Sequence, residues 1–128
     1  MSDKSIVDYK FKIALIGDTN VGKSALLRRL TEKDEFEQTD INNNYIPNTV
    51  GVDFKRENFI LDQSNINVSL AMYDTSGDEK YRLITLSYIE NVQAFIIAYD
   101  VTNIESFHNC QYWLQEITKS HNCSKNSK

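Results

Sequence analysis

The sequence is poor in several residue types whose abundance marks particular classes of protein. Its 128 residues contain a single proline and two cysteines, and 14 Lys and Arg are outnumbered by 18 Asp and Glu, for a net charge of -4. Cys110 and Cys123 are too few for a disulfide scaffold and do not form a C-x-x-C pair, which is typical of a reducing compartment. Because a basic stripe is also missing, we expect no nucleic-acid partner.

Long apolar runs and a secretory signal are missing as well. No stretch approaches the roughly 20 apolar residues that are needed to cross a bilayer. The segment Met1–Lys10 is polar and carries charges of both signs, unlike a signal peptide. A chain of this length is typical of one domain. We therefore expect residues 1–128 to form a single domain with a cytoplasmic, intracellular location.

Hydrophobic patterning predicts two buried strands and a hairpin. Apolar runs typical of strands buried on both faces occur at Phe11–Ile16 and Ala94–Tyr99. Between them, Val52–Leu61 and the alternating Ile66–Tyr73 flank Asp62–Asn65, which is rich in turn-forming residues. These two runs therefore predict an antiparallel hairpin.

Helical spacing of apolar residues occurs after the first strand and around the last one. Lys23–Glu32 predicts a helix with one apolar side. That side would consist of Leu26, Leu27 and Leu30. Asp34–Asn48 has no period and predicts a mobile surface loop. A second loop begins at Asp74 and leads into a helix that ends near Asn91.

The segment Thr102–Glu105 predicts the start of the last helix, because it has the capping-box pattern of a hydroxyl followed three residues later by a carboxylate. Apolar residues then recur at helical spacing. They are Ile104, Phe107, Cys110, Trp113, Leu114 and Ile117. We expect the polar residues 121–128 to form a frayed tail. Strand, helix, hairpin, helix, strand and helix in this order predict an α/β fold with a mostly parallel sheet flanked by helices.

The segment Gly17-Asp18-Thr19-Asn20-Val21-Gly22-Lys23-Ser24 fits the phosphate-loop pattern G-x-x-x-x-G-K-[ST]. Its glycines allow backbone angles at which successive N–H groups curl around phosphate oxygens, and the next helix offers its N-terminus to the same anion. Lys23 can reach the outer phosphates, and the hydroxyl of Ser24 can ligate Mg²⁺. The alternative is an ordinary strand-to-helix turn.

Further segments resemble the small GTPases, and within them the Rab branch. Thr49–Phe54 is similar to the Rab first switch, and Asp74–Gly77 to the entry of the second switch. Lys80–Thr85, Tyr99–Thr102 and Glu105–Phe107 also resemble Rab segments. The resemblance implies the G-domain fold of the P-loop NTPases, with GTP or GDP and Mg²⁺ as cofactors.

The resemblance also implies roles for individual residues. Nucleotide-binding positions would be Gly17, Asp18, Thr19, Asn20, Val21, Gly22, Lys23, Ser24, Ala25, Thr49, Asp74 and Gly77. Of these, Ser24, Thr49 and Asp74 would hold Mg²⁺, and Lys23 and Thr49, together with Asp78, would act in catalysis. A solvated loop threonine is the alternative for Thr49, and an aspartate that caps the next turn is the alternative for Asp74.

Effectors, exchange factors and GTPase-activating proteins are the partners that the resemblance implies. The effector contacts would be Ile46, Thr49, Val50, Gly51, Val52, Asp53, Phe54, Tyr73 and Tyr88. Phe54, Tyr73 and Tyr88 fall where Rab proteins place an aromatic cluster that reports the switch state, with Tyr73 in place of the usual tryptophan. Core packing remains open for these three aromatic residues.

Two departures from the family pattern bear on the expected activity. The glutamine that orients the attacking water would fall at position 78, where this chain has Asp78. A shorter, negatively charged side chain beside the γ-phosphate predicts impaired hydrolysis. We also expect a truncated G domain that lacks the family's C-terminal strands and helices, its guanine-reading motif and a cysteine for a lipid anchor.

Three functions remain open at this stage. The first is a Rab-like small GTPase that binds GTP or GDP with Mg²⁺, hydrolyses GTP slowly and acts in intracellular vesicle-mediated transport. The second is a truncated, catalytically impaired interaction module with weak or no nucleotide binding. The third is a generic P-loop enzyme that acts on ATP or a nucleoside, which the two switch segments argue against.

Overall fold

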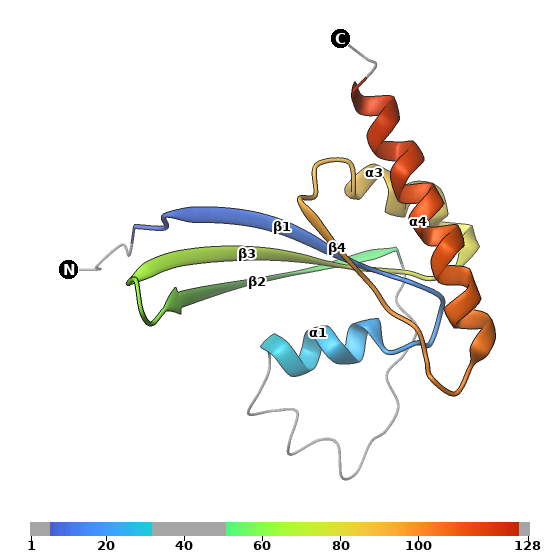
Figure 1. Ribbon diagram of the computed structural model, residues 1–128, viewed down its shortest axis with the longest axis horizontal. Helices are drawn as coiled ribbons and strands as arrows, with labels where there is room; N and C mark the ends of the chain where they lie inside the picture. The colour runs from blue at the N-terminus through green and yellow to red at the C-terminus, as the bar shows by residue number, and fades with distance from the viewer. Residues whose placement is uncertain (1–5, 32–50, 126–128) are drawn as a thin grey trace.

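Strand β1 (Tyr9–Ile16) lies inside a sheet of four strands with the order β2-β3-β1-β4 (Figure 1). The computed structural model describes residues 6–31 and 51–125. β1 runs parallel to β3 (Ile66–Thr75) on one side and to β4 (Ala94–Ile97) on the other. The predicted α/β fold with mostly parallel neighbours is confirmed.

The predicted hairpin is present. Strand β2 (Val52–Leu61) pairs antiparallel with β3, and the register brings Leu61 opposite Ile66. Asn65 closes the turn at a φ of 52°, and its N–H donates to the carbonyl of Leu61 over 2.9 Å. Asparagine tolerates this left-handed backbone better than most residues, which explains its place in the turn.

Helices cover both faces of the sheet (Figure 1). Alternate residues of β1 point to opposite faces. On one face, Leu15 packs with Leu27 from helix α1 (Lys23–Thr31) and with Met72. On the other face, Ala14 and Ile16 belong to a second buried cluster, which includes residues of and around helices α3 (Arg82–Tyr88) and α4 (Ile104–Lys125). Its remaining fully buried members are Ile89, Val92, Trp113 and Ile117.

The amino-terminal half of β1 is not buried, contrary to the prediction for Phe11–Ile16. Tyr9 and Phe11 are 54% and 42% exposed, and their rings stack with centroids 6.2 Å apart. The reason is that this end of the sheet extends beyond α3 and α4 (Figure 1). The prediction for Ala94–Tyr99 is also wrong in part. β4 ends at Ile97, and Ile96 is 46% exposed because β4 is an edge of the described sheet.

Helices α1 and α4 each bury only some of the apolar residues that recur at helical spacing in their sequences. In α1, Leu27 is buried, whereas Leu26 and Leu30 are exposed. In α4 (Ile104–Lys125), Trp113 and Ile117 are buried. Three other apolar residues that recur at helical spacing in α4 are exposed: Ile104, Phe107 and Leu114. Helical periodicity identifies residues that share a side of a helix, but the width of the contact depends on the neighbouring elements.

The start of α4 corrects the predicted capping box. Asn103, not Thr102, is the N-cap: its Oδ1 accepts hydrogen bonds from the N–H groups of Glu105 (3.1 Å) and Ser106 (3.4 Å). The hydroxyl of Thr102 instead donates to Oδ1 of Asp100 over 2.7 Å. Asn103 directly precedes Ile104, the first residue of the helix, and therefore stands at the N-cap position. The helix extends to Lys125, into the segment for which we expect a frayed tail.

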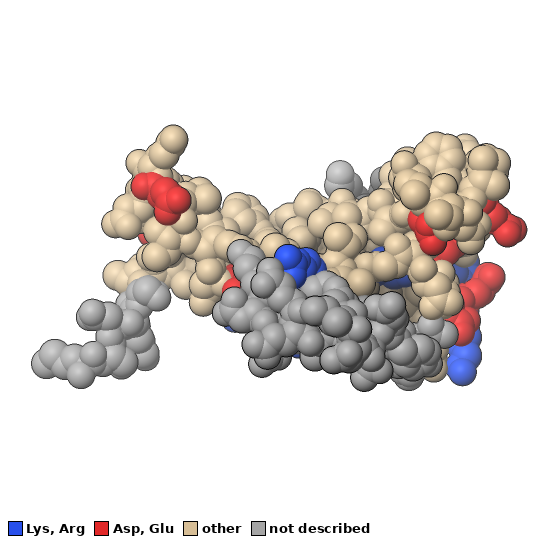
Figure 2. All heavy atoms as spheres, turned by 90° about the horizontal axis from the view of Figure 1, so that it is seen from below, with Lys and Arg blue, Asp and Glu red and all other residues tan. Residues whose placement is uncertain are grey.

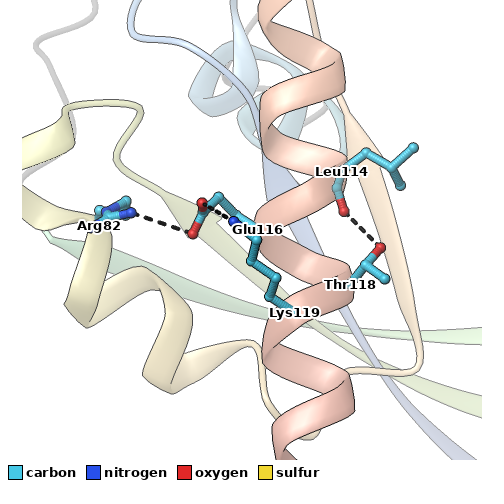
Figure 3. A network of polar contacts seen from close by, with 5 residues as sticks. All are labelled: Arg82, Leu114, Glu116, Thr118 and Lys119. Carbon is cyan, nitrogen blue, oxygen red and sulfur yellow. Dashed lines mark hydrogen bonds and ion pairs between the residues drawn. The ribbon is translucent and has the colours of Figure 1, made fainter.

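The segment after β3 forms the short 3₁₀ helix η1 (Glu79–Tyr81) and then α3 (Arg82–Tyr88). An ion pair joins α3 to α4: Arg82 lies 3.4 Å from a carboxylate oxygen of Glu116 (Figure 3). Lys119 approaches the other oxygen of Glu116 at 3.7 Å. Arg82 therefore fixes the first residue of α3 against the long helix.

Charges of both signs are interspersed on the face seen in Figure 2, where the visible Lys and Arg atoms form separate small groups. Over residues 6–31 and 51–125, we find no helix whose length and hydropathy would let it cross a membrane.

Candidate nucleotide-phosphate site

The phosphate loop and the second-switch segment meet at one edge of the sheet. Because β1 and β3 are parallel neighbours, their carboxyl ends lie side by side, with Leu15 opposite Asp74. The loop Gly17–Gly22 follows β1, and α1 begins at Lys23. The hydroxyl of Thr75 donates to the carbonyl of Leu15 over 2.7 Å and ties the two strand ends together. Ligands of open α/β sheets bind at such an edge.

The loop curls through backbone angles that most residues avoid. Gly17, Asn20 and Gly22 have φ values of 147°, 65° and 101°. Gly17 is also needed for space, because a Cβ there would lie 2.3 Å from the carbonyl oxygen of Ala98. The two glycines of the predicted motif therefore occupy positions where a side chain costs free energy. Of the other motif residues, Thr19 and Val21 are half-buried, and Ala25 lies in α1.

Lys23 is buried inside this curl. Its Nζ donates to the carbonyl oxygens of Gly17 (2.9 Å) and Asp18 (2.6 Å), and the residue is 5% exposed. Burial lowers the pKa of Lys23 to about 8, and the negative charges of Asp74 and Asp18 oppose this shift. The ammonium is thus held in the loop, with a proton affinity that a bound anion would raise.

Ser24 and Asp74, to which the family resemblance gives a shared role at Mg²⁺, lie close together. The hydroxyl of Ser24, in the first turn of α1, donates a hydrogen bond to Oδ2 of Asp74 at the end of β3. Asp74 is 3% exposed. A hydroxyl beside a carboxylate is a set of oxygen donors that suits Mg²⁺, which keeps several waters and takes few protein ligands. The donor set therefore fits the implied ion.

The second-switch segment lies directly against the phosphate loop. A Cβ on Gly77 would lie 2.2 Å from the carbonyl carbon of Asp18 and 2.2 Å from the nitrogen of Thr19. Only glycine permits this approach. Asp78 is exposed, and its Oδ1 accepts a hydrogen bond from the N–H of Lys80 over 3.1 Å, which caps η1.

The three aromatic residues of the predicted cluster are in contact. The rings of Phe54 and Tyr73 have centroids 5.4 Å apart, and those of Tyr73 and Tyr88 are 6.0 Å apart. Phe54 and Tyr88 are 45% and 52% exposed, whereas Tyr73 between them is half-buried and packs against the core cluster that contains Ala14 and Ile16. The two outer rings therefore lie at the surface, and the middle ring also contributes to core packing. Arg56 lies over the ring of Phe54, 5.7 Å from its centroid.

Part of the predicted first switch is described. Val52, Asp53 and Phe54 begin β2, and the carbonyl of Gly51 accepts a hydrogen bond from the N–H of Ser76 over 2.9 Å. This bond links the end of the first switch to the second. Three predicted residues lie outside the described residues: Ile46, Thr49 and Val50.

Two residues that contact the phosphate loop were not singled out as site residues from the sequence. The indole N–H of Trp113 donates to Oδ1 of Asp18 over 2.8 Å, and the amide of Asn109 donates to Oδ2 over 2.7 Å. The only signal in the sequence is their spacing of four residues, which places them on one side of a helix. This spacing does not identify Asp18 as the residue that they contact.

Comparisons with known proteins show which family this chain resembles. A family model described as the Ras family matches residues 12–127. GTP-binding protein ypt1 of Schizosaccharomyces pombe is 46% identical over 112 residues, which cover 88% of this chain and 51% of the relative. Over the same shares, Ras-related protein RABD2a of Arabidopsis thaliana is 44% identical and Ras-related protein RIC1 of Oryza sativa is 43% identical.

The chain spans about half the length of the curated relatives that it matches. The family match itself covers most of the chain and includes the phosphate loop, the second-switch segment and the aromatic cluster. The chain therefore belongs to the Ras family, as a Rab-like small GTPase.

Proposed function

We propose that this chain binds GTP or GDP together with Mg²⁺, hydrolyses GTP slowly and acts in intracellular vesicle-mediated transport. One observation carries the proposal: a curled phosphate loop with a buried lysine lies beside the Ser24–Asp74 pair. A loop that served only as a turn would have no need of an ammonium buried among its carbonyl groups, since that burial costs free energy.

Each residue has a distinct part in this proposal. The main-chain N–H groups of Gly17–Ser24 bind phosphate oxygens, and Lys23 neutralises the outer phosphates. Ser24 and Asp74, with Thr49, would hold Mg²⁺, which when bound neutralises negative charge on the phosphates. Gly77 donates its N–H to the γ-phosphate, which couples the second switch to the presence of the third phosphate group.

Asp78 makes hydrolysis slow in this proposal. Phosphoryl transfer depends on positioning and electrostatics, and a carboxylate cannot approach an anionic γ-phosphate as a neutral amide can. The capping bond of Asp78 to Lys80 favours the second candidate function, an interaction module with impaired catalysis, because it gives this side chain a structural task. Both functions use the same surface for partners.

We propose that effectors, exchange factors and activating proteins bind at the switch segments. The surface formed by Phe54, Tyr73 and Tyr88 supports this role, because exposed aromatic residues in contact with one another are typical of interaction sites. It lies on β2, β3 and α3, next to the segments that touch the phosphate loop. A change at the γ-phosphate could therefore reach it through Gly77.

The first experiment is a binding titration of the purified chain with GTP, GDP and ATP, each with Mg²⁺ and with a chelator. GTP and GDP binding that is stronger than ATP binding and strengthened by Mg²⁺ supports the leading proposal. No binding favours the silent interaction module, and a preference for ATP favours a generic P-loop enzyme.

A pair of serine variants makes this titration specific. Ser24→Ala removes the hydroxyl beside Asp74, and we expect the Mg²⁺-dependent affinity to fall at least about tenfold, as for loss of a hydrogen bond to a charged group. Ser87→Ala is the matched control, because this exposed hydroxyl donates only to the carbonyl of Ile84 within α3. Equal affinities of the two variants would contradict the proposed site.

A further inference from the structure

The carboxylate of Asp18 accepts hydrogen bonds from two side chains of α4. Oδ1 receives the indole N–H of Trp113 at 2.8 Å, and Oδ2 receives the amide of Asn109 at 2.7 Å. Trp113 is 4% exposed and belongs to the core cluster between the sheet and α4. The carboxylate of Asp18 therefore connects the phosphate loop to α4 through two hydrogen bonds, although their donors lie more than 90 positions away in the sequence.

The backbone of Asp18 takes part in the site itself. Its carbonyl oxygen accepts a hydrogen bond from Nζ of Lys23 over 2.6 Å. This is the shorter of the two hydrogen bonds that hold the ammonium, the other being to the carbonyl of Gly17. Its carbonyl carbon also lies where a side chain on Gly77 would have to be, 2.2 Å from an added Cβ. Asp18 thus contacts the phosphate-binding lysine and the second-switch segment through its main chain, and α4 through its side chain.

We infer that Asp18 is a positioning residue, which Trp113 and Asn109 hold in place so that the loop keeps Lys23 aimed at phosphate. The inference rests on the proposed function, since it concerns nucleotide affinity. The carboxylate itself would repel a phosphate if it pointed into the loop. Its two donors on α4 neutralise part of that charge and direct it away from the nucleotide.

The same geometry makes Trp113 a reporter of the loop. It is the chain's single tryptophan, so intrinsic tryptophan fluorescence arises at this contact alone. When nucleotide binds to the loop, the environment of Asp18 changes. Because the indole of Trp113 is hydrogen-bonded to Asp18, its fluorescence should change as well. We expect addition of GDP with Mg²⁺ to alter the fluorescence of the wild-type chain, and Asp18→Ala to abolish that response.

The decisive experiment measures GDP affinity in the presence of Mg²⁺, by calorimetry, alongside thermal stability. Trp113→Phe removes the indole N–H and keeps an aromatic ring in the core, and Asn109→Ala removes the second donor. We expect each to lower the affinity roughly tenfold, as for loss of a hydrogen bond to a charged group. Gln111→Ala, an exposed amide of the same helix, is the control and should bind as the wild type does.

A double-mutant cycle separates positioning from general destabilisation. In an Asp18→Ala background, Trp113→Phe should lower the affinity no further, because the bond it removes no longer exists. If the wild type binds GDP while both single variants bind within about twofold of it, the inference is wrong and the proposed function stands. If the wild type binds no nucleotide, the proposed function fails and the inference fails with it.

Discussion

The hydroxyl of Ser24 donates a hydrogen bond to a carboxylate oxygen of Asp74, although 50 positions separate the two residues. Ser24 lies in the first turn of α1, and Asp74 lies near the end of β3. They meet because β1, which leads into the phosphate loop, pairs in parallel with β3. The pairing of two strands thus brings a hydroxyl and a carboxylate to one point, where they suit a divalent ion.

Lys23 gives the protein a specific dependence on pH. Burial lowers its pKa from 10.5 to about 8. Between about pH 8 and 10.5 the unfolded chain binds more protons than the folded chain, so the contribution of Lys23 makes the folded state more stable as pH rises through this window. We expect Lys23→Met to remove that contribution, as measured by denaturant unfolding across the window.

The control is Lys119→Met, because the side chain of Lys119 is 73% exposed. It should leave the pH dependence of stability as in the wild type.

Nucleotide affinity should fall with rising pH, whereas the stability contribution of Lys23 rises, since a neutral amine attracts phosphate less than an ammonium does. Wild-type affinity should therefore fall as pH rises above about 8. A flat affinity profile would contradict the assignment of Lys23 to the phosphates.

The two glycines of the phosphate loop should differ in their tolerance of alanine. Gly17→Ala combines a strained φ of 147° with a Cβ only 2.3 Å from the carbonyl oxygen of Ala98. Gly22→Ala has a strained φ of 101° and meets nothing within 4 Å. Strain alone costs about 1–2 kcal/mol, and a clash in a packed region adds about 1–3 kcal/mol.

We therefore expect Gly17→Ala to lower the free energy of unfolding more than Gly22→Ala does, by a margin set by the clash. Denaturant unfolding of both variants, without nucleotide, tests this. Since the substitutions are chemically identical, each serves as the control for the other. Equal losses would mean that Ala98 moves away at no cost and that Gly17 is required only for its backbone angle.

Asp78 is the residue through which the rate of GTP hydrolysis can be raised. Asp78→Gln restores the longer neutral amide that the family pattern has at this position, and we expect single-turnover hydrolysis to rise roughly tenfold or more. Asp78→Asn removes the charge but keeps the shorter length and the oxygen that caps η1. A rate for Asp78→Asn near that of Asp78→Gln would assign the effect to charge rather than to reach. If neither variant exceeds the wild type, Asp78 does not limit hydrolysis.

Much of the site could be predicted from local patterns. The phosphate loop is a contiguous motif in which each fixed residue has a local backbone or chemical reason, so Gly17, Gly22, Lys23 and Ser24 could be identified directly. The strand order then explains why Asp74 reaches Ser24. Where both partners of a contact belong to recognisable segments, the sequence was sufficient.

The remainder depends on tertiary neighbours. The motif leaves position 18 unspecified, so nothing local indicated that Asp18 would turn toward Asn109 and Trp113. Periodicity similarly grouped Leu114 with Trp113 among the apolar residues at helical spacing in α4, yet Leu114 is 55% exposed and Trp113 is 4% exposed. Which part of an apolar stripe is buried depends on the elements packed against it, and those are set by the whole fold.

At the N-terminus of α4, the sequence pattern also placed the N-cap one residue away from its position in the structure. A pair of alanine substitutions can test which residue caps the helix. Thr102 and Asn103 are adjacent, and both residue types are common caps. Asn103 accepts the N–H groups of Glu105 and Ser106, whereas the hydroxyl of Thr102 donates to Asp100. Asn103→Ala should therefore destabilise the protein by about 1 kcal/mol, as is typical for loss of an N-cap.

Thr102→Ala is the matched control, because it removes one hydrogen bond at an exposed position and leaves both helix N–H groups satisfied. Its effect on the free energy of unfolding should be smaller, at about 0.5 kcal/mol or less. Denaturant unfolding of the two variants decides between the caps. A larger loss for Thr102→Ala would show that the capping box indicated by the sequence operates in solution, and that α4 begins one residue earlier than in the structure.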